Sequence, residues 1–114
     1  MTDPRELLTE AYRDFNARRM EDVLRHMSAD VVWANGWEGG HVRGHEGVRD
    51  YWTRQWAVLD PHVEPCGIDE DEAGRWVVEV HVVVRDTGGQ VVADKIVHHA
   101  YRISDGLIAR MDIE

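Results

Sequence analysis

The sequence has few of the residues that cross-link small domains. Among its 114 residues there is one cysteine, Cys66, so no intramolecular disulfide can form and a stable fold has to come from a buried core. No run approaches the roughly 18 apolar residues of a membrane-spanning helix, and the N-terminus lacks the apolar segment of a signal peptide. We therefore expect one domain over residues 1–114, located in the cytoplasm and without membrane contact.

Positive charge is also scarce. Lys and Arg together number 13 against 22 Asp and Glu, which gives a net charge of -9. Such a surface repels phosphate backbones, so no nucleic-acid partner is expected. The sequence also lacks the Gly-x-Gly-x-x-Gly nucleotide loop, a P-loop and the Gly-x-Ser-x-Gly elbow of hydrolases. These absences predict that the protein uses no cofactor.

The N-terminal half has helical patterns. Helical spacing of apolar residues predicts three helices, over residues 3–16, 20–27 and 45–59. Asp3 is suited to the N-cap of the first helix, and Pro4 to its first turn. Between the second and third helices we expect a short strand over residues 31–35 and then a loop with four glycines over residues 36–44.

Alternating apolar and polar residues dominate the second half. They predict four strands, over residues 63–68, 75–85, 90–103 and 107–113. Pro65 and Gly67 mark the first of these as an edge strand. Asp-Gly and Gly-Gly pairs between the later strands are typical of hairpins. Helices followed by a meander of hairpins predict an α+β fold, with three N-terminal helices on one face of an antiparallel sheet.

Strand parity predicts which side chains face the helices. In the strand over residues 90–103, His99 and Tyr101 share a mostly apolar row that begins at Lys95. His98 falls in the opposite, mostly polar row. A neutral imidazole in an apolar pocket can exchange a proton near pH 7, which makes His99 the main catalytic candidate. A core histidine satisfied by one hydrogen bond is the alternative.

Aromatic residues are candidates for the wall of a pocket. Trp52 and Trp56 are four residues apart and share a helix face, and Trp37 in the glycine-rich segment suits a pocket rim. Ordinary core packing is the alternative, and for Asn35, which precedes a glycine, a turn is the alternative. The candidate ligand-binding residues are Tyr12, Phe15, Trp33, Asn35, Trp37, Trp52, Trp56 and Tyr101.

His41, His45 and Glu46 are of residue types that bind metal ions and lie close together in the sequence. Gly44 lies between the two histidines and the segment is expected to be a loop, so the helical spacing of a zinc site is missing. A metal also needs at least three convergent ligands, and the sequence has no second cluster to supply them. No metal site is therefore expected.

Segments along nearly the whole chain resemble the SnoaL-like branch of the nuclear transport factor 2-like superfamily. The segments are residues 16–23, 28–33, 42–48 and 99–108. The resemblance implies a strongly curved, cone-shaped sheet with mixed pairing at its edge and a pocket between the sheet and the helices. It also implies a homodimer formed through the outer face of the sheet.

The superfamily includes polyketide cyclases, ketosteroid isomerase, limonene epoxide hydrolase and plain binding domains. By resemblance to the cyclases, His99 and Asp112 are the acid/base pair, although parity alone turns Asp112 outward. The general base of the isomerase falls on Asn35, whose amide cannot take up a proton. The protonated aspartic acid of the isomerase's oxyanion hole falls on His99, and its helix tyrosine falls on Ala11, next to Tyr12. Isomerase chemistry is therefore not supported.

The residues and the resemblance lead to one functional prediction. The protein is expected to bind a small, mostly apolar molecule that is aromatic or carries a carbonyl group. Cofactor-free acid/base chemistry of a cyclase, isomerase or hydrolase type is one extension of this prediction. A non-catalytic ligand-binding or dimerisation domain is the alternative.

Overall fold

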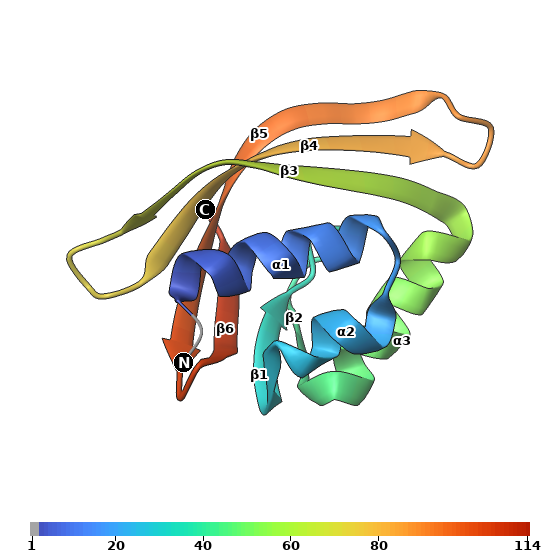
Figure 1. Ribbon diagram of the computed structural model, residues 1–114. Helices are drawn as coiled ribbons and strands as arrows, with labels where there is room; N and C mark the ends of the chain where they lie inside the picture. The colour runs from blue at the N-terminus through green and yellow to red at the C-terminus, as the bar shows by residue number, and fades with distance from the viewer. Residues whose placement is uncertain (1–2) are drawn as a thin grey trace.

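The computed structural model describes residues 3–114. Its elements are α1 (Pro4–Asn16), α2 (Met20–Arg25), β1 (Met27–Ala34), β2 (His41–Arg43), α3 (Gly44–Val58), β3 (Leu59–Glu70), β4 (Trp76–Asp86), β5 (Val91–Ser104) and β6 (Leu107–Ile113). The strands form one sheet in the order β2-β1-β6-β5-β4-β3 (Figure 1). The α+β prediction is confirmed, with β3 at an edge as expected. No helix in the described part of the chain has the length and hydrophobicity to cross a membrane.

The pairing of β1 with β6 corrects the expectation of an antiparallel sheet. β1 runs parallel to β6, with Val32 opposite Arg110 and Trp33 opposite Met111, while the other strand pairs are antiparallel. A parallel pair needs a long connection between its strands, and here α3 and the strands β3 to β5 supply it. The sheet is therefore mixed, and the parallel pair lies in its interior rather than at its edge.

Two short segments also differ from the prediction. β1 begins at Met27 rather than Val31, because α2 ends at Arg25 and Met27 already pairs with Ile108 of β6. The glycine-rich segment contains the three-residue strand β2, in which His41 lies opposite Ala34 of β1. Local composition does not reveal either strand, because the start of β1 pairs with a strand that is distant in the sequence and β2 is very short.

Helix α1 is fixed at both ends. The Asp3 carboxylate accepts a hydrogen bond from the Arg5 N–H at 3.2 Å, as expected of an N-cap. At the other end the Asn16 amide donates to the carbonyl oxygen of Val63 at 2.7 Å and accepts from its N–H at 2.9 Å. These bonds satisfy backbone groups on the free edge of β3. α1 is therefore fixed along β3, on the side of the sheet where the helices pack.

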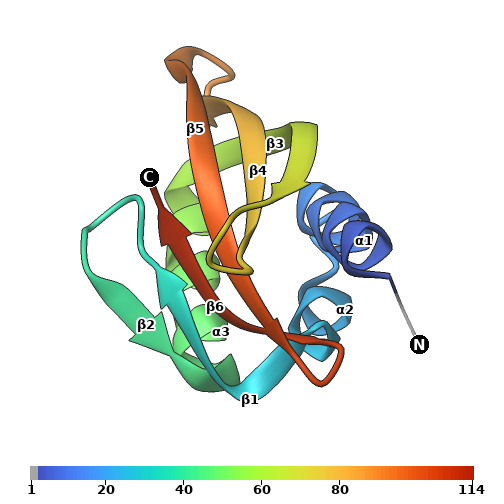
Figure 2. The same cartoon turned by 90° about the vertical axis from the view of Figure 1, so that its left-hand side faces the viewer.

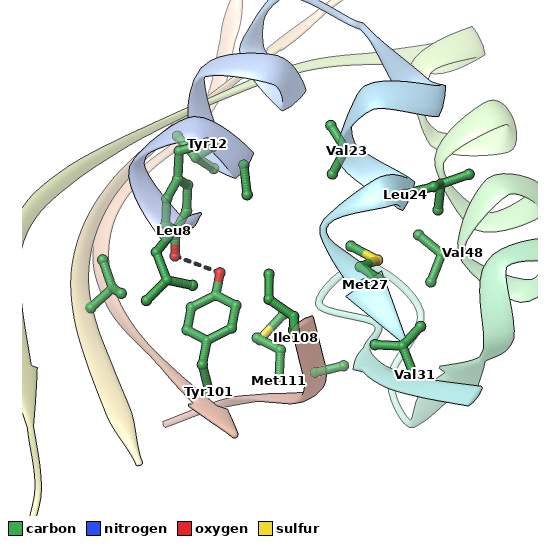
Figure 3. Close-up of a cluster of buried hydrophobic side chains, with 14 of the residues drawn as sticks. Leu8, Tyr12, Val23, Leu24, Met27, Val31, Val48, Tyr101, Ile108 and Met111 are labelled. Carbon is green, nitrogen blue, oxygen red and sulfur yellow. Dashed lines mark hydrogen bonds between the residues drawn. The ribbon is translucent and has the colours of Figure 1, made fainter. Parts of the chain in front are cut away.

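A continuous apolar core joins the helices to the sheet. The inward row of β4 includes Val78 and Val80, which are fully buried, as is Leu8 of α1. Each such side chain contributes about 2 kcal/mol through its removal from water. Figure 3 shows Leu8 and Tyr12 of α1 above Tyr101 of β5. In Figure 2 the strands β5 and β6 lie in front of α3, with α1 and α2 to one side. The core thus fixes α1 over the row of β5 that contains His99.

Candidate functional site

A cavity of about 350 Å³ lies between the long strands and the helices α1 and α3. Strands β3, β4 and β5 contribute apolar side chains to it, among them Val63, Val82 and Val97. A cavity of this size, with mainly apolar walls, is typical of small-molecule sites. The structure brings most of the candidate residues together in its lining: Tyr12, Phe15, Trp33, Trp37, Trp52, His99 and Tyr101.

The aromatic part of the wall is held by ring contacts. The Trp52 ring meets Trp33 edge to face at 5.5 Å between centroids and meets Phe15 in the same way at 5.1 Å. Trp56 stacks on Trp52 at 5.7 Å, and the Arg18 guanidinium lies 5.1 Å from the Trp56 ring centre. Trp56 is not part of the lining, so it supports the wall from behind rather than facing a ligand. Such interlocked rings form a rigid apolar surface.

Strand β5 places His99 in the wall of the cavity. His99 lies opposite Val78 of β4, in the same inward row as Tyr101, and its side chain is 8% exposed. The neighbouring His98 is exposed on the other face. Burial lowers the pKa of His99 to about 4, and the positive charge that His98 can carry acts in the same direction. The imidazole of His99 is therefore neutral at pH 7.

A chain of hydrogen bonds determines which ring nitrogen of that imidazole carries the proton. The Tyr101 hydroxyl donates to the Tyr12 hydroxyl oxygen at 2.7 Å, and the Tyr12 oxygen lies 2.9 Å from Nδ1 of His99 (Figure 3 shows the first bond). If Nδ1 were the donor, the Tyr12 oxygen would accept its proton, and one of the two buried tyrosine hydroxyl protons would have no acceptor among residues 3–114. Leaving a buried donor unpaired costs about 1–3 kcal/mol. The chain thus assigns Tyr12 as donor to Nδ1, and the proton of the neutral ring to Nε2.

The two tyrosines keep their protons. Burial raises the pKa of Tyr12 and of Tyr101 well above the usual value, and the neighbouring Tyr101 raises that of Tyr12 further. Among the described residues, the hydrogen bond between Nδ1 and Tyr12 is the one that the His99 ring forms, and Nε2, which has no such partner, is not among the fully buried polar atoms. The site therefore presents a neutral N–H donor in an otherwise mostly apolar wall.

Asp112 lies on the opposite face of the sheet from His99. In the β5–β6 register Ile113 is opposite His99, whereas Asp112 is opposite Ala100. The Asp112 carboxylate accepts hydrogen bonds from Arg110 at 2.7 Å and from His41 at 2.8 Å. The Arg110 hydrogen bond is the main cause that holds the pKa of this carboxyl below its usual value. The structure follows the parity prediction and does not bring Asp112 to His99.

Asn35 also lies outside the lining of the cavity. Its side-chain oxygen accepts hydrogen bonds from the N–H groups of Trp37, at 3.0 Å, and Glu38, at 2.7 Å, and its amide donates to the Glu38 carboxylate at 3.0 Å. These bonds close a turn after β1, which is the alternative that the Asn-Gly pair suggested. The amide of Asn35 is thus used within the turn.

The histidines considered as metal ligands have other partners. His41 bonds to Asp112, and a ring nitrogen of His45 lies 3.0 Å from the Met27 carbonyl oxygen. Within residues 3–114 no group of three or more His, Cys, Asp or Glu side chains could hold a metal ion.

The wall contains polar residues that the sequence predictions do not include. Gln55 and Tyr51 of α3 and Lys95 of β5 line the cavity. The signal for Lys95 is its place in the same strand row as His99. The link between Tyr12 and His99 joins positions 87 residues apart, so no local pattern reveals it.

Comparison with known proteins identifies the fold. Residues 8–111 match the SnoaL-like domain family. A nuclear transport factor 2-like protein of unknown function from Burkholderia pseudomallei is similar, with 21% identity and a TM-score of 0.85 over 100% of this chain and 91% of its own. TerC, co-crystallised with polyporic acid, is 26% identical, with a TM-score of 0.82 over 96% of this chain and 88% of its own.

A third similar structure is RV0760c from Mycobacterium tuberculosis in complex with estradiol-17beta-hemisuccinate. It is 19% identical, with a TM-score of 0.78 over 92% of this chain and 87% of its own. Among curated protein sequences none matches. Because the family match extends over residues 8–111, and the similar structures share the arrangement of helices and sheet, the chain belongs to the SnoaL-like domain family and has the nuclear transport factor 2-like fold.

Proposed function

We propose that the protein binds a small, mostly apolar molecule in this cavity and that Nε2–H of His99 donates a hydrogen bond to a carbonyl oxygen of that molecule. The observation that supports this most strongly is the chain from Tyr101 through Tyr12 to His99, which leaves Nε2–H as a donor without a protein partner among the described residues. A donor in a mostly apolar wall gains a hydrogen bond when a ligand supplies an acceptor. In this proposal the cavity is the internal pocket of the cone-shaped sheet that the resemblance implies.

The comparisons are consistent with a ligand of this kind. TerC was crystallised with polyporic acid, and RV0760c with a steroid ester. The aromatic wall of Trp33, Trp52 and Phe15 in this chain offers flat apolar surfaces of the sort that ring systems pack against.

Acid/base catalysis by His99 and Asp112 has less support. A general base needs an unprotonated atom within reach of the substrate, but Nδ1 of His99 accepts from Tyr12 and Asp112 lies on the other face. Among the described residues, the lining contains no Asp or Glu. Nε2–H is suited to stabilise a negative charge that develops on a carbonyl oxygen, so oxyanion stabilisation is the second candidate function.

Removal of the donor should remove the preference for a carbonyl. We expect the protein to bind 2-acetonaphthone about tenfold more tightly than 2-ethylnaphthalene, which has a similar shape and no carbonyl, because one desolvated hydrogen bond is worth about 1–1.5 kcal/mol. His99→Leu should bind both compounds equally, as measured by isothermal titration calorimetry. His98→Leu, which changes the exposed neighbour, should keep the preference. Equal binding of the two compounds by the unmodified protein would rule out the proposed role of His99.

We also propose that the outer face of the sheet forms the homodimer interface that the resemblance implies. Ile96 on this face is 54% exposed. On β4, opposite Ile96, His81 forms a hydrogen bond with the Asp94 carboxylate at 2.7 Å. An exposed apolar side chain bordered by paired polar groups is typical of interfaces between subunits.

A charge at the centre of this face should prevent dimer formation. Ile96→Glu would place a carboxylate in each half of a symmetric interface, so we expect the variant to be monomeric at concentrations where the unmodified protein is a dimer. Sedimentation equilibrium measures the mass directly. Val58→Glu, which adds the same charge at a half-exposed position of α3, serves as the control and should remain dimeric. A monomeric unmodified protein would refute the proposed interface.

A further inference from the structure

Lys95 is the only lysine in the sequence, and it lines the cavity. It lies on β5 opposite Val82 of β4, and Val82 in turn lies opposite Val63 of β3. These neighbours belong to the apolar wall, so the ammonium group extends from an apolar surface at the exposed end of the row that contains His99.

No acidic side chain neutralises this ammonium group. Among residues 3–114, Lys95 forms no ion pair, and the cavity lining contains no carboxylate. Its neighbour Asp94 lies on the outer face, where it pairs with His81. Since His99 is neutral at pH 7, Lys95 is the only formal charge in the described lining. A cation in this place is unusual for a protein with a net charge of -9, whose surface otherwise repels anions.

The distance between Lys95 and His99 sets the length of a matching ligand. Four residues of extended strand separate Lys95 from His99, which corresponds to about 13 Å along β5. The cavity therefore has a neutral donor in its buried part and a positive charge near its mouth. A single ammonium group, with no second cation in the described lining, matches one negative charge, as on a carboxylate.

We propose that the cavity binds an elongated apolar molecule that carries a carboxylate at one end, held by Lys95, and a carbonyl oxygen at the other, held by His99. This inference rests on the proposed binding function and narrows it to apolar carboxylic acids. The carboxylate remains near solvent, so it loses little hydration while the apolar body is buried.

Calorimetry with three naphthalene compounds tests the inference. The probes are 6-acetyl-2-naphthoic acid, its methyl ester and 2-acetonaphthone; the acid has its carbonyl and its carboxylate at opposite ends of a rigid ring system. We expect the unmodified protein to bind the acid about fivefold more tightly than the ester, the gain of one partly exposed ion pair. Lys95→Met should lose this preference and keep its affinity for 2-acetonaphthone, whereas Lys95→Arg should keep the preference.

Arg102→Gln provides a matched control, because it removes one positive charge from the outer face of the same strand. It should retain the preference for the acid, and added salt should weaken that preference in the unmodified protein. If 2-acetonaphthone binds but the acid and the ester bind equally, the role of Lys95 is refuted and the proposed function stands. If Lys95→Met keeps the preference, the role of Lys95 is likewise refuted. If none of the three probes binds, both proposals fail.

Discussion

Acidification from pH 7 to pH 4 should lower the free energy of unfolding by about 3 kcal/mol through His99 alone. The pKa of His99 is about 4 in the folded protein against 6.5 for an unperturbed histidine. Between these two values the unfolded chain binds a proton at this position and the folded protein does not. Stability therefore rises with pH in this window: the contribution of His99 is complete above pH 6.5 and is lost as the pH falls towards 4.

Urea unfolding of the unmodified protein and of His99→Gln at several values between pH 7 and pH 4 isolates this contribution. Glutamine can accept the Tyr12 hydrogen bond but does not titrate. The free energy of unfolding of His99→Gln should therefore fall about 3 kcal/mol less than that of the unmodified protein over the same pH range. Other groups titrate equally in both proteins and cancel in the difference. His62→Gln changes an exposed histidine outside the cavity and should lose stability much as the unmodified protein does. Parallel curves for the unmodified protein and His99→Gln would show that His99 is not buried as a neutral ring.

Loss of the Tyr12 hydroxyl should cost about 2–4 kcal/mol of stability, because it leaves two buried groups without partners. In Tyr12→Phe the Tyr101 hydroxyl proton has no acceptor and Nδ1 of His99 has no donor. Tyr101→Phe removes only the first donor of the chain, so Tyr12 can still donate to His99. We expect this second variant to cost about 1 kcal/mol.

Thermal and urea unfolding of the two tyrosine variants measures this asymmetry. Both substitutions remove one hydroxyl from a buried ring, so they lose similar packing and differ mainly in the polar groups that they leave unpaired. Equal costs for the two variants would contradict the assigned direction of the hydrogen bonds. A cost for Tyr101→Phe above that for Tyr12→Phe would contradict it more strongly.

The features that depend on strand parity are predictable from the sequence. The alternation in β5 separates His99 from His98, and in the structure the first lines the cavity while the second is exposed. For Asp112, parity and the resemblance to cyclases predict different faces of the sheet. The structure follows parity, because the β5–β6 pairing is regular from His99 opposite Ile113 to Arg102 opposite Arg110. Strand parity therefore predicts the face on which Asp112 lies, which the resemblance alone does not.

The features that depend on distant pairing were not predictable. The parallel pair of β1 and β6 joins Met27 to Ile108, and the small or polar residues between Met27 and Val31 do not have the apolar alternation typical of a strand. The same holds for the hydrogen bond that gives His99 its tautomer, since Tyr12 comes from the first helix and Tyr101 from the fifth strand. The sequence indicates that these side chains share a pocket wall, but not which atom donates to which.

The protonation of the His99 ring is the central claim, and nitrogen-15 NMR measures it directly. Long-range proton–nitrogen correlation spectra of labelled protein at pH 7, with His99 assigned by the signals missing from His99→Gln, report on each ring nitrogen separately. We predict a ring with a proton on Nε2 and none on Nδ1. A proton on Nδ1 alone, or on both nitrogens, would contradict the account.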